Sequence, residues 1–325
     1  MMFTLFLSII LIFVPQIAHS PAALEPAAPE ENIFSKVEER VLETAIQKEG
    51  DSPISGLPRA APRGPQKKEE SKSLGIVTTA RAALVFDEAT GSILFEKDSR
   101  EKLSLASLTK LMTALVFLET NPDWDRKINL NKADEKEGGI FYARAPEEVK
   151  IKDLFNMMLV GSVNNAAMAI TRSTGMGEDE FVAKMNEKAK ALNLEDTFFV
   201  DPTGLLTGNM GTAYDVAKML SYALENDKIK EAVLRKRYVF SPGRSQKVYY
   251  VKSTDELLWS FLNESPYEIV GGKTGYIEEA GYNLAVEFEK DEHKIIVVVL
   301  GSATAGNRFQ EVKGLTVWAF ENYNW

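Results

Sequence analysis

The pattern of hydrophobic and polar positions divides the chain into three parts: an apolar run over residues 1–17, a polar stretch to about residue 75, and a regularly patterned segment to the C-terminus. In the third part, continuous or alternating apolar runs predict strands at 82–86, 92–96, 237–240, 247–252, 268–274, 281–288 and 294–301. Apolar residues three and four positions apart predict helices at 108–119, 151–160, 164–173, 178–192, 212–226 and 307–323.

This order of elements predicts an α+β fold. Strands near both ends of the segment are expected to form one antiparallel sheet of about five strands, flanked by helices, with an all-helical lobe inserted between them. Residues 87–91 predict the turn of an opening hairpin. Thr212 and Asp215 predict a capping box at the start of a helix, with Asp in place of Glu.

The apolar run at the N-terminus leads into Ala18, His19 and Ser20, and small residues at the first and third of these positions are typical of a signal-peptide cleavage site. We therefore interpret residues 1–20 as a secretory signal or an N-terminal anchor. Whether the segment is cleaved or retained stays open at this point. In both cases the sequence predicts export.

Residues 21–75 have the composition of a tether. They hold seven of the thirteen prolines, and Phe34 is their only aromatic residue. Such a stretch has little to bury, so we expect it to be disordered. Residues 33–47 carry apolar positions at helical spacing, which predicts either a transient helix or a docking segment. The domain that carries the chemistry is expected over residues 76–325, with no further β-rich domain after it.

Composition excludes several kinds of chemistry. The chain has 325 residues, a net charge of −9, no cysteine and two histidines, His19 and His293. The acidic balance argues against a nucleic-acid partner. Without cysteine there is no disulfide, no thiolate nucleophile and no cysteine-based metal site. His19 lies in the export segment and His293 in a charged turn, so neither suits a Ser-His-Asp triad. A hydrolytic enzyme of this sequence needs another base.

Ser107 and Lys110 form a Ser-x-x-Lys pair at the beginning of an apolar helix. Residues three apart share a helix face, so the amine can reach the hydroxyl. Burial lowers the pKa of a lysine, and a neutral amine can accept the serine proton. The unpaired N–H groups of a helix start can stabilise an oxyanion. Taken alone, the pair is far more typical of an ordinary helix cap than of an active site.

Two further motifs favour an active site. Ser162 and Asn164 form a Ser-x-Asn between two predicted helices, and Lys273 begins a Lys-Thr-Gly at the end of a predicted strand. Ser-x-x-Lys, Ser-Asp-Asn and Lys-Thr-Gly together mark penicillin-binding proteins and class A β-lactamases. Here all three motifs occur in this order, and each lies in the expected structural context.

Over residues 76–325 the chain resembles the low-molecular-weight penicillin-binding proteins, the serine-type D-alanyl-D-alanine carboxypeptidases of peptidase family S11. The resemblance rests on the three motifs and on segments 82–91, 106–114, 199–205, 272–284 and 295–301. It implies a β-lactamase/transpeptidase-like fold and an enzyme of cell-wall remodelling that acts on the periplasmic or cell-wall side of the membrane. The implied partners are peptidoglycan stem peptides ending in D-Ala-D-Ala, and β-lactams that mimic them. No cofactor or metal is implied.

The resemblance also implies a role for each motif residue. Ser107 is the expected nucleophile, Lys110 its base, and Ser162 the relay of a proton to the leaving amine. Substrate binding is expected from the side chain of Asn164 and from the strand residues Lys273, Thr274, Gly275 and Tyr276. Of these, Lys273 and Thr274 are expected to bind the terminal carboxylate. The backbone N–H groups of Ser107 and Tyr276 are expected to form the oxyanion hole.

Some positions depart from the family pattern. Val163 stands where the family usually has Gly or Ala, and Asn165 where Asp is common, so the range of substrates is uncertain. Thr203 replaces a frequent His, and any role of that His is lost.

Three alternatives stay open beside the carboxypeptidase. A D,D-endopeptidase that cleaves cross-links uses the same residues. A class A β-lactamase needs a deacylating Glu-x-x-x-Asn, which is not found around residues 201–209. An inactive wall-binding module is disfavoured because every residue needed for acylation is present.

Overall fold

The computed structural model describes residues 64–136, 138–242 and 247–325. The predicted export segment 1–20, the amphipathic segment 33–47 and most of the tether 21–75 lie outside the described residues. Within the described ranges, no helix combines the length and the apolar character needed to cross a bilayer.

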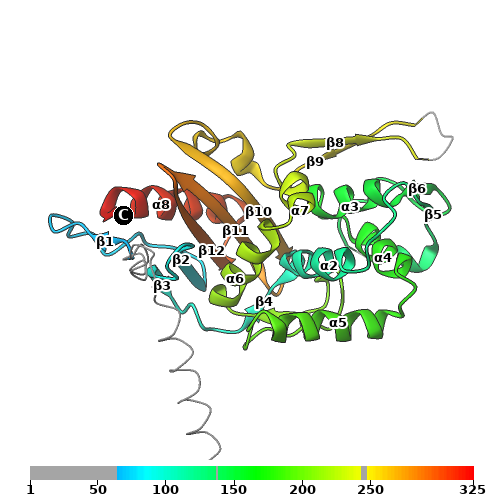
Figure 1. The fold of residues 1–325 in the computed structure, drawn as a ribbon, viewed down its shortest axis with the longest axis horizontal. Coiled ribbons are helices and arrows are strands. Elements are labelled where there is room, and N and C mark those ends of the chain that lie inside the picture. Colours follow the sequence, from blue (N-terminus) through cyan, green and yellow to red (C-terminus); the bar gives the residue numbers. More distant parts are fainter. Residues whose placement is uncertain (1–63, 137, 243–246) are drawn as a thin grey trace, which may run out of the picture. The chain divides into compact units, whose positions relative to one another are not determined.

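The core of the domain is a five-stranded antiparallel sheet with the order β10-β11-β12-β2-β3 (Figure 1). Its strands are β2 (Ala82–Asp87), β3 (Ile93–Lys97), β10 (Tyr267–Ile277), β11 (Gly281–Lys290) and β12 (His293–Ser302). The pairing of β12 with β2 joins the two ends of the domain in one sheet. This confirms the predicted α+β fold and its sheet of about five strands.

Both faces of this sheet are buried, and successive residues face opposite cores. Along β12, Ile296 and Val298 belong to one hydrophobic cluster, whereas Ile295 and Val297 belong to another. Helix α8 (Ala305–Asn322) packs on the second face, and helix α6 (Ala213–Leu224) on the first. Burial on both faces explains why these strands read as nearly continuous apolar runs rather than as alternating ones.

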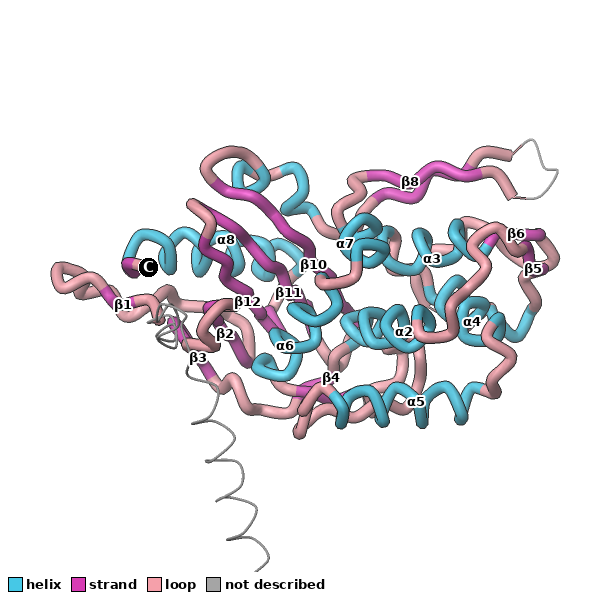
Figure 2. The backbone as a smooth tube through the Cα atoms, viewed as in Figure 1, coloured by secondary structure: helices cyan, strands magenta, loops and turns pink. Residues whose placement is uncertain are grey.

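The helical lobe lies beyond the β10 edge of the sheet (Figure 2). Helix α2 (Thr109–Leu118) is apolar on nearly every side and is buried in the lobe. It contacts α6 and three further helices: α3 (Ile151–Val160), α4 (Asn164–Ser173) and α5 (Glu178–Ala191). The other helices of the lobe supply one apolar face each. The lobe also contains the short helix α7 (Asp227–Val233).

The predicted helix 212–226 differs from the structure at both ends. Thr212 does cap α6 by accepting a hydrogen bond from the N–H of Asp215, at 3.0 Å. The Asp215 carboxylate instead accepts from the N–H of Asp196 at 2.9 Å, so the second half of the predicted capping box is missing. Helix α6 ends at Leu224, and Asn226 caps the separate helix α7.

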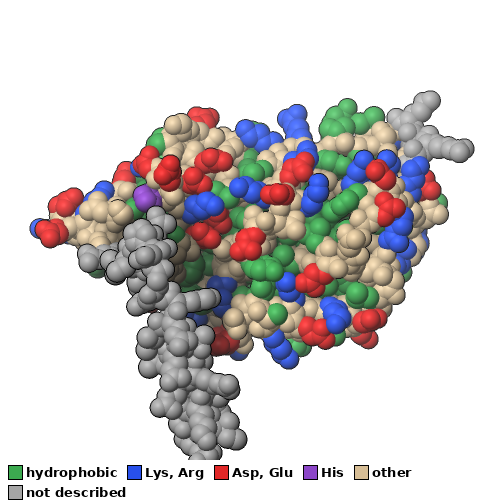
Figure 3. Space-filling model, viewed as in Figure 1, with side chains coloured by type: hydrophobic (Ala, Val, Ile, Leu, Met, Phe, Trp, Pro, Cys, Tyr) green, Lys and Arg blue, Asp and Glu red, His purple; other side chains and the backbone are tan. Residues whose placement is uncertain are grey.

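Short strand pairs lie outside the main sheet, and most of their strands were not predicted. The first, β1 (Gln66–Lys67), lies within the predicted tether and pairs with β13 (Tyr323–Asn324) at the C-terminus. The remaining pairs are β4 (Leu103–Ser104) with β7 (Met210–Gly211), β5 (Lys127–Asn129) with β6 (Glu148–Lys150), and β8 (Arg237–Phe240) with β9 (Tyr249–Lys252). Of these, only the strands β8 and β9 were predicted. Figure 3 shows acidic and basic side chains interspersed over one face of the molecule.

Candidate active site

Ser107 lies in a 3₁₀ turn, η1 (Ala106–Leu108), that leads directly into α2. Ala106 has a positive φ of 47°, a conformation that few non-glycine residues adopt. Two glycines allow other segments of the chain to pack closely against this turn. A Cβ added at Gly204 would lie 1.9 Å from the Ala106 carbonyl oxygen, and one at Gly275 would lie 2.8 Å from the Leu105 carbonyl oxygen. Gly275 therefore brings β10 against the backbone of the serine.

Lys110 contacts Ser107 as the three-residue spacing predicts. Its Nζ donates to Ser107 Oγ at 2.8 Å, to Asn164 Oδ1 at 2.7 Å and to the main-chain oxygen of Thr203 at 2.6 Å. The lysine side chain is fully buried. Three acceptors thus hold a single amine against the hydroxyl, and the geometry is suited to proton transfer.

Burial also sets the charge of this amine. Desolvation lowers the pKa of Lys110 to about 7, although the carboxylate of Asp201 acts in the opposite direction. That carboxylate is itself held by the backbone N–H groups of Thr203 and Gly204, at 2.6 and 2.9 Å from Oδ1, and by that of Leu206 at 2.9 Å from Oδ2. Near neutral pH a large share of Lys110 is uncharged. It can then accept the proton of a nucleophilic serine.

Ser162 and Lys273 form a second serine–lysine contact. Ser162 lies between α3 and α4 with a positive φ of 56°, and Lys273 Nζ donates to its Oγ at 2.8 Å. Lys273 is buried on β10, and desolvation lowers its pKa well below the ordinary value. A left-handed serine is strained, and such strain is typical of functional positions. The hydroxyl of Ser162 is thus presented to the same strand that packs against Ser107.

Asn164 connects the helical lobe to the nucleophile. Its Oδ1 accepts from Lys110, and its Nδ2 donates to the carbonyl oxygen of Gly138 at 2.9 Å. Both ends of this amide therefore have protein partners. The side chain orients the lysine in addition to the substrate-binding role that the sequence predicts.

The residues of the Lys-Thr-Gly segment line one end of β10. Thr274 Oγ1 lies 2.6 Å from Thr254 Oγ1, and Tyr276 is half exposed and stacks on Tyr282 with ring centroids 4.3 Å apart. Together with the contacts above, all of the predicted site residues converge on the junction between η1, the α3–α4 connection and β10.

Sequence reasoning missed some residues at this junction. Thr203 was noted only for the loss of a histidine side chain, yet its main-chain oxygen is a partner of Lys110. Arg308 of α8 donates to the carbonyl oxygen of Gly275 at 3.1 Å, and the charge of the buried Asp255 raises the pKa of Lys273. A backbone acceptor leaves no signature in a sequence. Arg308 and Asp255 are distant from the motifs along the chain, so the sequence does not indicate that they act on the site.

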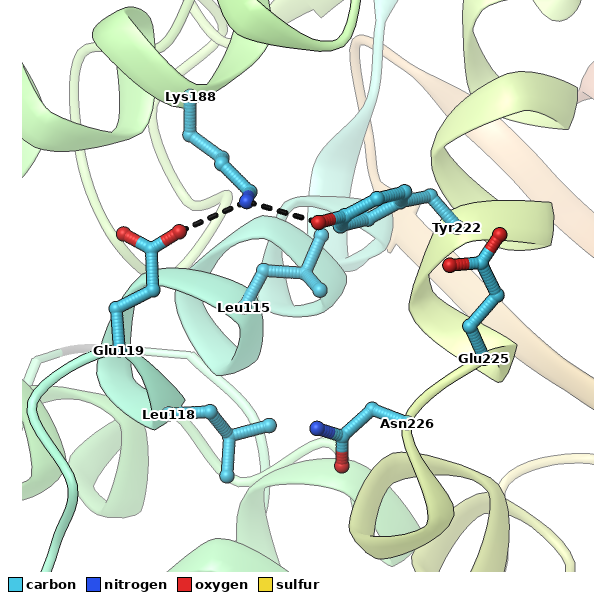
Figure 4. A pocket seen from close by; sticks show the side chains of 7 residues that line it. All are labelled: Leu115, Leu118, Glu119, Lys188, Tyr222, Glu225 and Asn226. Carbon is cyan, nitrogen blue, oxygen red and sulfur yellow. Dashed lines mark hydrogen bonds and ion pairs between the residues drawn. The ribbon is translucent and has the colours of Figure 1, made fainter.

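A separate pocket of about 320 Å³ lies at the far end of α2, lined by α2, α5 and α6 (Figure 4). Lys188 points across it and donates to Glu119 Oε1 at 2.8 Å and to the Tyr222 hydroxyl at 3.2 Å. Its amine is thus held by a carboxylate and a phenol. None of the predicted site residues lines this pocket.

The fold brings a serine into contact with a buried lysine amine, an arrangement that suits a serine acyl-transfer enzyme. A model of the D-alanyl-D-alanine carboxypeptidase family, S11, matches residues 67–304, and the chain belongs to this family. It is a serine-type D-alanyl-D-alanine carboxypeptidase by this membership.

Individual relatives carry two named activities, carboxypeptidase and endopeptidase. The chain is 30% identical over 275 residues to D-alanyl-D-alanine carboxypeptidase DacF of Bacillus subtilis, covering 81% of this chain and 68% of that protein. It is 34% identical over 207 residues to a D-alanyl-D-alanine endopeptidase of Haemophilus influenzae, covering 63% and 69% of the two chains. Penicillin-binding protein D2 of Listeria monocytogenes, solved with cefotaxime bound, has a TM-score of 0.66 and 28% identity, over 76% of this chain and 99% of that one.

Proposed function

We propose that the enzyme removes the terminal D-Ala from peptidoglycan stem pentapeptides through an acyl-enzyme on Ser107. The observation that carries the proposal is the contact of Ser107 Oγ with the buried amine of Lys110, whose pKa is about 7. A lysine that is partly neutral at physiological pH supplies the base that the histidines of this chain do not.

In the first half of the reaction, Lys110 accepts the Ser107 proton while Oγ attacks the carbonyl carbon between the two D-alanines. The backbone N–H groups of Ser107 and Tyr276 receive the negative charge on the carbonyl oxygen. Gly275 supports this step because only a residue without Cβ lets β10 approach the turn so closely. Ser162 then relays the proton to the leaving nitrogen, and D-Ala departs.

In the second half, water attacks the ester carbonyl, Lys110 takes a proton from that water, and the Ser107 hydroxyl is restored. When the substrate first binds, its terminal carboxylate is held by Lys273 Nζ and the hydroxyl of Thr274. The negative charge of this carboxylate raises the pKa of Lys273, which burial lowers in the free enzyme, and so favours the ammonium. Lys273 also supports Ser162, to which it donates at 2.8 Å. A buried cation is a strong partner for a carboxylate because little water screens the pair.

The competing activity is cleavage of peptide cross-links. It is supported by the similarity to the Haemophilus influenzae protein, which is named an endopeptidase. The two are separated with defined substrates: a pentapeptide monomer and a cross-linked dimer of equal purity. A carboxypeptidase releases D-Ala from the monomer at least tenfold faster than it converts the dimer to monomers. The reverse preference would replace the proposed activity by an endopeptidase.

We further propose that β-lactams acylate Ser107, since they mimic the D-Ala-D-Ala end. The Listeria monocytogenes protein binds cefotaxime, which supports this part of the proposal. An adduct that clears within seconds would point to a β-lactamase instead. The enzyme is proposed to act outside the cytoplasmic membrane, and the segment 1–20 is proposed as its export signal or anchor.

A further inference from the structure

Asn283 of β11 is a buried polar residue that the reaction above leaves without a role. It is fully buried, and both ends of its side-chain amide are bonded to main-chain atoms. Nδ2 donates to the carbonyl oxygen of Ser104 at 2.9 Å, and Oδ1 accepts from the N–H of Gly301 at 2.8 Å. Ser104 lies three residues before the nucleophile Ser107, so this amide joins the sheet to the segment that carries the serine.

The contact with Gly301 lies at an irregularity of the main sheet. The register between β11 and β12 shifts at Asn283, where Leu300 and Gly301 of β12 lie opposite this single residue. Gly301 has a positive φ of 70°, which glycine adopts without strain. An extra residue of this kind is left without a regular ladder partner. The Asn283 amide supplies that partner, and its own position in the sheet is fixed in return.

Asn283 is also the cross-strand partner of Gly275, the glycine at which β10 meets η1. Side chains at directly opposite positions of an antiparallel pair project from the same face of the sheet. A Cβ added at Gly275 would lie 3.2 Å from the main-chain nitrogen of Ser107, so this face is the one that η1 covers. One cross-strand pair therefore provides both the space for the turn and a hydrogen bond that holds the chain leading into it.

We propose that Asn283 is a positioning residue for the oxyanion hole: its amide sets the distance between the N–H groups of Ser107 and Tyr276. The inference rests on the proposed function, in which these two groups stabilise the negative charge on the carbonyl oxygen. Tyr276 directly follows Gly275 on β10, and Ser107 lies on the segment that Asn283 holds through Ser104. Asn283 itself does not touch the substrate.

Loss of the Asn283 contact frees the serine segment from one of two attachments. The N–H of Leu105 donates to the carbonyl oxygen of Asn209 at 2.8 Å, which attaches the segment to the loop before β7. The Asn283 bond attaches it to the sheet. Without that bond the carbonyl of Ser104 is buried without its donor, and the segment gains by moving toward another partner. Such a movement widens the oxyanion hole and leaves the contact between Ser107 and Lys110 within η1 and α2 intact.

The test uses the full chain and the infrared band of the ester carbonyl in the penicillin acyl-enzyme, identified by ¹³C labelling of the β-lactam carbonyl. Asn283→Leu removes both hydrogen bonds at nearly the same side-chain size. Asn283→Ala removes them too and leaves room for water at the freed main-chain groups, which favours folding. Asn186→Ala is the matched control, because the Asn186 amide likewise bonds the N–H and the carbonyl of one residue, Phe199, at 2.9 and 2.8 Å. Melting temperatures establish that each variant is folded.

We expect the carbonyl band to move to higher wavenumber in both Asn283 variants, because weaker hydrogen bonds polarise the carbonyl less. The rate constant for acylation should fall by about tenfold to 10²-fold. The dissociation constant of the complex that precedes acylation should change by less than about twofold, since the lost interaction belongs to the transition state. Asn186→Ala is expected to keep the wild-type band.

A merely structural amide would lower the melting temperature without changing the hydrogen bonds of the ester. A wild-type carbonyl band in a folded Asn283 variant therefore overturns this proposal alone. A wild-type enzyme that forms no adduct at Ser107 overturns the proposed function and this proposal with it.

Discussion

The charge state of Lys110 can be tested without any substrate, through the dependence of stability on pH. The perturbation is Lys110→Met, which keeps the bulk of the side chain and removes its titration. In the folded protein the pKa of Lys110 is about 7, against an ordinary value of 10.5. Between these values the unfolded chain binds a proton that the folded protein does not. Stability therefore rises with pH across this window and is lowest below pH 7.

The magnitude follows from the two pKa values. Over the whole interval from pH 7 to 10.5, the titration of Lys110 increases the free energy of unfolding by about 5 kcal/mol. Between pH 7 and pH 9, the same titration increases the free energy of unfolding by about 2 kcal/mol. The absolute stability of Lys110→Met is less informative, because the substitution also leaves the acceptors on Asn164 and Thr203 without their donor.

The assay is urea-induced unfolding of the wild type and of Lys110→Met at pH 7 and pH 9. The gain in stability between the two pH values is expected to be about 2 kcal/mol smaller in the variant. The cation of Lys110 lowers the pKa of Lys273, so Lys110→Met raises that pKa, and the contribution of Lys273 adds to the expected difference and does not oppose it. Lys188→Met is the matched control: partial burial lowers the pKa of Lys188, but Glu119 and Tyr222 raise it overall, so this variant keeps the wild-type gain.

An equal gain in the wild type and in Lys110→Met would refute the reasoning. It would mean that Lys110 remains an ammonium in the folded protein at pH 7, and that a different group takes the serine proton.

Three further predictions concern other positions. Ser162→Gly removes the hydroxyl and accommodates the positive φ of 56°, so penicillin acylation should fall by about 10²-fold or more while the melting temperature stays within a few degrees. Gly275→Ala would place a Cβ 2.8 Å from the Leu105 carbonyl, and stopped-flow acylation should slow at least tenfold with a lower melting temperature. Burial raises the pKa of Glu287 to about 7, so this group costs stability as the pH rises from about 4.5 through 7. Glu287→Gln should therefore be about 1–3 kcal/mol more stable at pH 8 in urea unfolding, with unchanged acylation.

The parts of the site that could be predicted are those that depend on residues close together in the sequence. Ser107 and Lys110 are three residues apart on one helical turn, so their contact follows from helix geometry. The Lys-Thr-Gly segment ends an apolar strand, and the structure places it on β10 against η1. The sheet was predictable because its apolar runs could satisfy burial only between two layers of helices.

The parts that could not be predicted depend on tertiary contacts. Thr203 acts through a main-chain oxygen, which every residue possesses. Asp255 and Arg308 are polar residues next to a short turn and on a long helix, and only the fold brings their charges close enough to act on the pKa of Lys273. Helix α7 (Asp227–Val233) was not predicted, because its seven residues are too few to establish a helical periodicity, although the preceding helix was correctly expected to end near Asn226.

The central claim is that Ser107 forms the acyl-enzyme with Lys110 as its base. Mass spectrometry of the full chain after exposure to a penicillin, followed over time beside Ser107→Ala, tests it most directly. We expect a persistent mass increase equal to one penicillin on the wild type, located on the peptide that contains Ser107, and none on the variant. An unmodified wild type, or an equal adduct on Ser107→Ala, would contradict the account.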